Sequence, residues 1–226
     1  MKTILIVGSS RGIGEELTRY FSDADHNVIG VSRSPSKNCE WISADLSAPE
    51  GIQMIADHLG ERSIDTLIYS SGIWEDEGFS ENFDFKKTKY EETQKIMQVN
   101  LVAPIELTKT LAPNLACSSN PRAIYLGAIS GLENIGSEQV AYAASKFGLR
   151  GAIQSLRKAL RQENIGFTVI NLGNVGTEEV LTDIEEGRMA DQAPIPISDI
   201  ITSIEMIMSL SKDVEIGDIN LSQKSI

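Results

Sequence analysis

Residues 3–21, TILIVGSSRGIGEELTRYF, decide the fold predicted for this chain of 226 residues. Residues 3–7, with an unbroken apolar run at 4–7, have the length and composition of a fully buried strand. Residues 8–14 form a glycine-rich turn, and residues 15–21 carry apolar side chains at helical spacing. The chain is therefore predicted to open with a strand, a tight turn and a helix.

The glycines of this turn indicate an anion site. Gly8, Gly12 and Gly14 let the backbone turn sharply and approach a pyrophosphate closely, and the helix that follows directs its positive end toward that anion. A purely structural turn rarely needs three glycines at this spacing directly after the first strand. The turn predicts dinucleotide binding.

Strands and helices continue to alternate along the chain, which predicts an α/β fold. About seven strands are expected, at 3–7, 27–31, 41–43, 66–69, 123–126, 167–172 and 215–221, and helices at 15–21, 52–59, 88–111, 139–163 and 198–210. Pro104 is expected to kink the helix over 88–111 or to mark an early turn in it. Right-handed crossovers then give one doubly wound parallel sheet with helices on both faces.

The length fits a single domain over residues 1–226. Two segments break the alternation, 74–87 and 174–196, and both have the composition of loops. Loops at the carboxyl ends of strands surround the ligand crevice of an open α/β sheet, so these insertions are predicted to form a substrate wall or lid. The alternative is that they are surface excursions.

Composition excludes several classes of function. The net charge of −12 and the lack of a basic run argue against a nucleic-acid partner. His26 and His58 are the only histidines, which leaves no Ser/His/Asp machinery, and no metal site is expected. The apolar run at residues 4–7 is too short for a signal peptide or a membrane span, so we expect a cytoplasmic protein without membrane segments.

The end of the second strand predicts which dinucleotide is preferred. NAD-specific turns usually carry an acidic residue there to hold the ribose 2′-hydroxyl, whereas this chain has Arg33. Arg33 would attract a 2′-phosphate, and Arg11 could lie against the same group. NADP(H) is therefore predicted over NAD(H), the alternative being that both arginines are solvated surface charges.

The stretch YAASK (residues 142–146) places a phenol and an ammonium one helical turn apart on the same face. Two unit charges about 4 Å apart at an effective dielectric of ~20 interact by roughly 4 kcal/mol, enough to lower a phenol pKa from ~10 to near neutrality. Lys146 is thus a candidate tuner of Tyr142 as a proton donor. Alternatively, the tyrosine simply packs on the lysine stem.

Together, the glycine turn, the later Tyr-x-x-x-Lys pair and the domain size resemble the short-chain dehydrogenase/reductase family over nearly the whole chain. The resemblance implies a Rossmann-like fold and a catalytic set of Tyr142, Lys146, Ser130 and Asn100. The expected cofactor-binding residues are Gly8, Ser10, Arg11, Gly12, Ile13, Gly14, Arg33, Asp45, Leu46, Ser71, Gly72, Tyr142, Lys146, Gly173, Val175 and Thr177.

The resemblance implies a small carbonyl or alcohol substrate and a homodimer or homotetramer paired through the helices at 88–111 and 139–163. Two departures from the family pattern stand out. Ser70-Ser71-Gly72 replaces the usual Asn-Ala-Gly, and Ser130 lies one residue closer to the tyrosine than the usual serine, a position held here by Ile129. The leading hypothesis is an NADP(H)-dependent oxidoreductase; the alternative is a catalytically weak dinucleotide-binding sensor or interaction protein.

Overall fold

A computed structural model describes residues 1–78, 80, 82–186 and 193–224, and these form one parallel sheet of seven strands. The strand order is β3-β2-β1-β4-β5-β6-β7. The strands are β1 (Thr3–Val7), β2 (Asn27–Ser32), β3 (Glu40–Ser43), β4 (Thr66–Tyr69), β5 (Arg122–Ala128), β6 (Gly166–Leu172) and β7 (Asp218–Leu221). The predicted doubly wound fold is confirmed.

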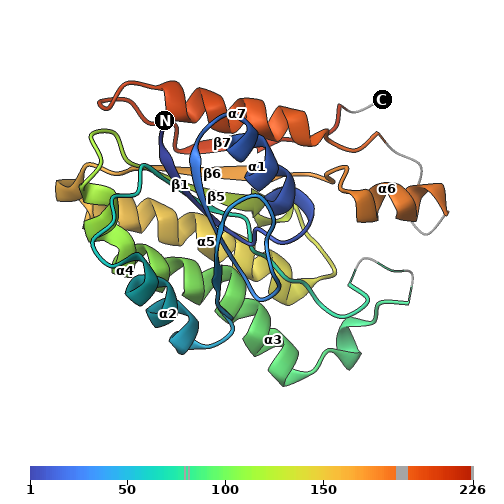
Figure 1. Cartoon of the computed structure of the whole chain (residues 1–226). Helices are drawn as coiled ribbons and strands as arrows, with labels where there is room; N and C mark the ends of the chain where they lie inside the picture. The colour runs from blue at the N-terminus through green and yellow to red at the C-terminus, as the bar shows by residue number, and fades with distance from the viewer. Residues whose placement is uncertain (79, 81, 187–192, 225–226) are drawn as a thin grey trace.

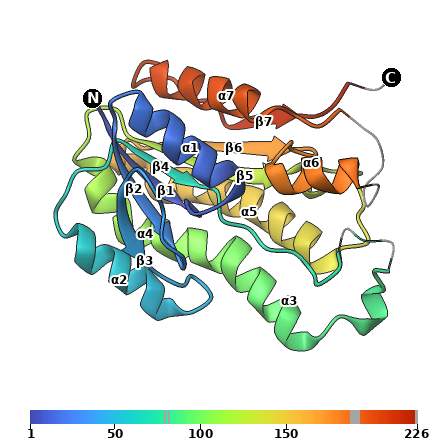
Figure 2. The ribbon, with the colours of Figure 1, turned by 45° about the vertical axis from the view of Figure 1, so that its right-hand side comes forward.

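Helices cover both faces of the sheet, as Figures 1 and 2 show. Helices α1 and α7 lie on one face, and α2, α4 and α5 on the other. The helices run as α1 (Gly12–Asp23), α2 (Pro49–Leu59), α3 (Tyr90–Met97), α4 (Ala103–Ala116), α5 (Val140–Ala159), α6 (Glu178–Glu185) and α7 (Ile197–Ser209).

The first strand shows how the two cores arise. Leu5 and Val7 point into the core beneath α2, α4 and α5, whereas Ile4 and Ile6 point into the core beneath α1 and α7. All four side chains are fully buried, and each contributes about 1.5 to 3 kcal/mol of hydrophobic free energy relative to an exposed side chain. Burial on both faces explains why the strand is apolar at four consecutive positions, 4–7, rather than at alternate ones.

The position of β1 in the sheet creates the site. Strand β1 pairs with β2 on one side and with β4 on the other. Strands β2 and β3 extend the sheet in one direction from β1, and β4 to β7 extend it in the other, so the strand order reverses at β1. The hydrogen bonding of both strand pairs continues one residue beyond the strand ends. Gly8 N donates to Val31 O (2.8 Å), and Ser70 N donates to Val7 O (2.9 Å). A crevice opens where the order reverses, and ligands of open α/β sheets bind there.

The helix predicted over 88–111 is not a single α-helix. It is α3, then a π-helical turn over Gln98–Val102, then α4, with Pro104 in the first turn of α4. In the π turn Ala103 N donates to Gln98 O. The next carbonyl, that of Val99, has no such donor because proline lacks an N–H, and it accepts instead from the buried Tyr69 hydroxyl at 2.7 Å.

Two other expectations need correction. The helix predicted over 139–163 ends at Ala159 and is followed by a 3₁₀ turn, Arg161–Glu163. The segment 174–196, predicted to be a loop, contains α6, whose N-terminus is capped by the Thr177 hydroxyl accepting from Val180 N at 3.4 Å. Residues 79, 81 and 187–192 of the two insertions lie outside the described residues.

Both views place α6 and the segment between β4 and α3 at the same end of the molecule, beyond the carboxyl ends of the strands. Among the described helices, none is both long enough and apolar enough to cross a membrane.

The tight first turn generates a stability prediction. A Cβ added at Gly14 would lie 1.9 Å from the Gly8 carbonyl oxygen, whereas one added at Gly151, in α5, would meet no atom within 4 Å. Gly14→Ala should therefore lower the free energy of unfolding by about 1 to 3 kcal/mol. The control Gly151→Ala should raise it by up to ~1 kcal/mol, because alanine favours the helix. Urea denaturation measures both, and equal stabilities for the two variants would contradict this packing.

Candidate active site

A cleft of about 570 Å³ lies at the reversal point of the sheet, within the size range of cofactor sites. Its walls come from the glycine turn, the ends of β2 and β4, the segment after β3 and the start of α6. Twelve of the predicted cofactor residues line it: Gly8, Ser10, Arg11, Gly12, Ile13, Gly14, Arg33, Asp45, Leu46, Ser71, Gly72 and Thr177.

One wall of this cleft is formed by the backbone of the glycine turn. Gly8 has a φ of +90°, a conformation that side-chain-bearing residues rarely adopt, and a Cβ there would lie 2.8 Å from Ser71 N. Arg11 occupies the N-cap of α1, but its side chain makes no capping hydrogen bond. The first-turn N–H groups and the positive end of the helix dipole thus remain available to an anion, and a pyrophosphate fits this cradle.

Charged side chains of both signs surround the cleft. Arg11, Arg33 and Lys95 supply the positive charge. The pKa of Asp45 is lowered, first by the hydrogen bond from Ser47 N (2.9 Å) and to a smaller extent by the charges of Arg33 and Lys95. Arg33 thus lies close enough to influence the Asp45 carboxylate, and both residues line the cleft.

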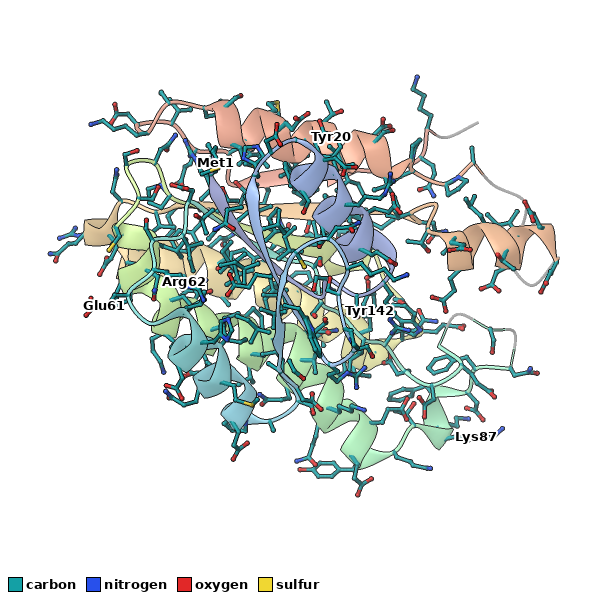
Figure 3. The ribbon with its side chains drawn as sticks, in the orientation of Figure 1. Met1, Tyr20, Glu61, Arg62, Lys87 and Tyr142 are labelled. Atoms are coloured by element: carbon teal, nitrogen blue, oxygen red, sulfur yellow. The ribbon has the colours of Figure 1, made fainter. Side chains whose placement is uncertain are left out.

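The predicted Tyr/Lys pair lies on α5. Figure 3 shows Tyr142 on the side of the molecule from which α6 extends. Lys146 is only 5% exposed, and its Nζ donates to Leu126 O at the end of β5, 2.9 Å away. The same Nζ is 5.7 Å from the centroid of the Tyr142 ring. The sequence-based prediction that the phenol and ammonium share one face of the helix is confirmed by this geometry.

The pKa of Tyr142 moves in the direction opposite to the sequence-based expectation. Burial is the main cause and the negative charge of Glu75 the second, and together they raise that pKa to about 12. Burial also lowers the pKa of Lys146 to about 8. The positive charge of Lys146 alone would lower the pKa of Tyr142, but both groups also lose water on burial, and desolvation disfavours the charged form of each.

Asn100 connects the π turn to the strand end beside the cleft. Its Oδ1 accepts from Ile73 N at 2.9 Å, and its Nδ2 donates to Ile73 O at 2.7 Å and to Ser145 Oγ at 3.0 Å. Ser145 Oγ in turn donates to Tyr142 O at 2.7 Å. Asn100 therefore holds the backbone after β4 against the helix that carries Tyr142.

Gly72 shows how close these groups lie to the cleft. A Cβ at Gly72, which lines the cleft, would be 3.3 Å from Lys146 Nζ and 3.8 Å from Asn100 Oδ1. Lys146, Tyr142 and Asn100 do not themselves line the cleft, but the first and last of them lie directly behind its glycine wall.

Ser130 follows β5 in the 3₁₀ turn Ile129–Gly131. Its Oγ is buried and has no hydrogen-bond partner among the described residues. A buried hydroxyl without a partner costs stability, and such groups are found where a ligand completes the hydrogen bonding. Ser130, one residue away from the usual family position, thus has a hydroxyl whose hydrogen bonding the described residues do not complete.

Besides Tyr142 and Lys146, two predicted cofactor residues, Gly173 and Val175, lie away from the cleft lining. Gly173 N donates to Leu221 O (2.8 Å), which continues the pairing of β6 with β7. Val175 is buried in the core beneath α1 and α7 and forms a parallel bridge with Ile195. The structure brings neither to the cleft wall, whereas Thr177, two residues further on, does line it.

Several residues of the cleft lining were not predicted from the sequence, among them Ser70, Ile73 and Lys95. Trp74, Glu178, Glu179 and Asp183 were not named as site residues, but they belong to the segments 74–87 and 174–196 that were predicted to form a wall or lid. One signal was available: Thr177 followed by two glutamates is a typical helix start, which indicates α6. The buried Glu75 beside Tyr142 had no sequence signal, because only the folded structure places residue 75 against the start of α5.

A parallel doubly wound sheet with a glycine cradle at its reversal point and a Tyr/Lys pair behind it defines the class of dinucleotide-binding oxidoreductases. The sequence profile described as short chain dehydrogenase matches residues 2–187. The chain therefore belongs to the short-chain dehydrogenase/reductase family.

Relatives and solved structures agree with this assignment. The chain is 29% identical over 214 residues to a rhamnolipid-biosynthesis 3-oxoacyl-[acyl-carrier-protein] reductase of Pseudomonas aeruginosa, covering 85% of this chain and 81% of the relative. A 4-hydroxyisoleucine dehydrogenase mutant complexed with NADH and succinate superposes with a TM-score of 0.83 at 24% identity, covering 97% and 96%. A short chain dehydrogenase of Shigella flexneri complexed with NADP superposes with a TM-score of 0.81 at 21% identity. The match covers 97% of this chain and 95% of the Shigella chain.

The contrast between two serines of the site generates a stability prediction. Ser130→Ala removes a buried hydroxyl without a partner and should change the free energy of unfolding by less than about 0.5 kcal/mol. Ser145→Ala is the matched control, because that hydroxyl bonds both Asn100 and Tyr142 and its loss should cost about 1 to 3 kcal/mol. Chemical denaturation of both variants is the measurement. A large loss in Ser130→Ala would mean that its hydroxyl is bonded within the protein.

Proposed function

We propose that this protein is an NADP(H)-dependent oxidoreductase that interconverts a small carbonyl compound and its alcohol. The observation that carries the proposal is the Tyr142/Lys146 pair, whose lysine lies behind the glycine wall of a cleft with a dinucleotide cradle. When bound, the nicotinamide supplies the hydride that the protein itself cannot. The side chains then supply proton transfer and orientation.

Tyr142 is the group that exchanges a proton with the substrate oxygen. A phenol with a pKa of about 12 is fully protonated at neutral pH, the form that donates to a carbonyl oxygen as negative charge develops there. The Ser130 hydroxyl, free of protein partners among the described residues, donates a second hydrogen bond to that oxygen and orients it.

Lys146 stabilises the tyrosinate left after proton donation. Its ammonium is desolvated and fixed by the Leu126 carbonyl, so the charge acts at low local dielectric and needs little reorganisation. Asn100 maintains the distance between the strand end and α5 through its bonds to Ile73 and Ser145. In the family Asn100 corresponds to a residue that holds a water beside the lysine, and we propose the same role here.

The preference for NADP(H) rests on Arg11 and Arg33. Both line the cleft, and the acidic residue typical of NAD-specific turns is missing at the end of β2. The similar solved structures include complexes with NADH and with NADP, so the family alone does not decide between them. Guanidinium groups at this end of the cleft favour the extra phosphate.

The substrate class we propose to screen first is a 3-oxoacyl thioester, because the Pseudomonas relative is named as a reductase of that compound class. The Tyr/Lys geometry and the reductase relatives favour an enzyme over a sensor that has lost its chemistry. A cytoplasmic location and assembly as a homodimer or homotetramer stay predictions of the sequence.

The role of Tyr142 is tested by Tyr142→Phe. Loss of the hydroxyl removes the proton donor, so turnover should fall by about 100-fold or more while NADPH affinity changes little. The matched control is Tyr90→Phe, since Tyr90 is 72% exposed on α3 and should show wild-type rates. NADPH oxidation in the presence of a ketone panel gives the rates, and undiminished turnover in Tyr142→Phe would rule out this mechanism.

The cofactor preference is tested by Arg33→Asp. The substitution should weaken NADPH binding by about tenfold or more and leave NADH binding nearly unchanged, because only NADPH carries the 2′-phosphate. Arg161→Asp, at an exposed arginine outside the cleft lining, controls for the overall change in charge. Nicotinamide fluorescence titrations measure both affinities, and an unaltered NADPH:NADH ratio in Arg33→Asp would refute the phosphate contact.

A further inference from the structure

Glu75 is a buried carboxylate at the start of the helix that carries Tyr142. Only 1% of its surface is exposed. Its Oε1 accepts hydrogen bonds from two consecutive backbone groups, Ala141 N at 2.8 Å and Tyr142 N at 3.2 Å. A side chain from the segment after β4 therefore caps α5.

The local sequence of α5 does not provide this cap. Gln139 occupies the N-cap without a capping side-chain bond, and the first turn of the helix contains no acidic residue. The Gln139 side chain instead donates to Gly78 O, which ties the same segment to the helix. Glu75 thus supplies both the hydrogen-bond acceptor and the negative charge that the positive end of the α5 dipole attracts.

Capping alone does not require this arrangement. The second oxygen, Glu75 Oε2, is buried and has no hydrogen-bond partner among the described residues. A serine or asparagine would accept the same two N–H groups without burying a charge, and a buried carboxylate oxygen left unpaired is costly. The charge therefore calls for an explanation beyond the integrity of the helix.

The titratable groups near Glu75 supply an explanation for its buried charge. On α5 these are Tyr142 and Lys146, on α3 Glu92, which accepts from Asp76 N, and on the segment itself the exposed Asp76. Of these four, Tyr142 is the one whose backbone N–H donates a hydrogen bond to Glu75. After burial, the negative charge of Glu75 is the second cause that raises the pKa of the Tyr142 phenol.

We propose that Glu75 is a positioning residue for Tyr142, one that fixes the first turn of α5 and whose negative charge holds the phenol in its proton-donating form. The inference rests on the proposed function and adds to it a second charge acting on the proton donor. Glu75 opposes Lys146: the ammonium stabilises the tyrosinate, and the carboxylate destabilises it. Burial and the Glu75 carboxylate together keep the proton on Tyr142 until a carbonyl oxygen takes it.

Two substitutions separate the cap from the charge. Glu75→Gln keeps an oxygen that can accept from Ala141 N and Tyr142 N but removes the negative charge. Alcohol oxidation uses the tyrosinate as base, so its rate should rise with pH about one unit lower in this variant than in the wild type. Glu75→Ala also removes the acceptor and should lower turnover by about tenfold or more with KM for NADPH unchanged.

The control is Asp76→Asn, which removes an equal charge from the adjacent, exposed residue and should leave the pH profile in place. A Glu75→Gln profile that superimposes on the wild-type profile would overturn the charge role and leave a structural cap. Unchanged turnover in Glu75→Ala would overturn the positioning role. If Glu75→Ala does not fold, the Glu75→Gln profile alone decides.

Failure of the proposed function can be told apart from failure of this inference. If the wild type turns over no carbonyl or alcohol, the tyrosinate absorbance is titrated with pH in the wild type, Tyr142→Phe and Glu75→Gln. Subtracting the Tyr142→Phe titration curve from the wild-type curve isolates the ionisation of Tyr142. That ionisation should move to lower pH in Glu75→Gln, and an unmoved ionisation would refute the inference without reference to any substrate.

Discussion

The close approach of Gly14 to the carbonyl of Gly8 is the constraint on which the arrangement of the cleft depends. With space for no side chain there, α1 starts directly beneath the end of β1 and points its unpaired N–H groups into the crevice. The same packing brings Gly8 against Ser71 at the end of β4, and Gly72 then lies against Lys146. One steric constraint thus sets the spacing between the phosphate cradle and the proton donor.

Much of this could be predicted from the sequence, because the deciding features are local. The apolar run of β1, the glycine spacing and the one-turn spacing of Tyr142 and Lys146 each depend on a few neighbouring residues. The residues of α6 that line the cleft and the carboxylate of Glu75 depend on contacts between distant segments. The pKa direction of Tyr142 was mistaken for the same reason, since burial is a property of the whole fold.

The site combines well-bonded and poorly bonded polar groups. Asn100 forms hydrogen bonds with Ile73 and Ser145, and Ser145 forms one with the Tyr142 carbonyl. These bonds hold α5 against the backbone that follows β4. Ser130 Oγ and Glu75 Oε2 are buried without partners among the described residues. Such groups reduce stability, and they are expected where polarity is retained for chemistry rather than for folding.

Pro104 has a consequence beyond the shape of its helix. Because it offers no N–H, the Val99 carbonyl is left to accept from Tyr69, whose fully buried hydroxyl would otherwise be a donor without an acceptor. An evolutionary coupling between positions 69 and 104 follows. A lineage that replaced the tyrosine with phenylalanine would lose the selection that retains the proline, and a lineage that replaced the proline first would expose the tyrosine to a competing donor.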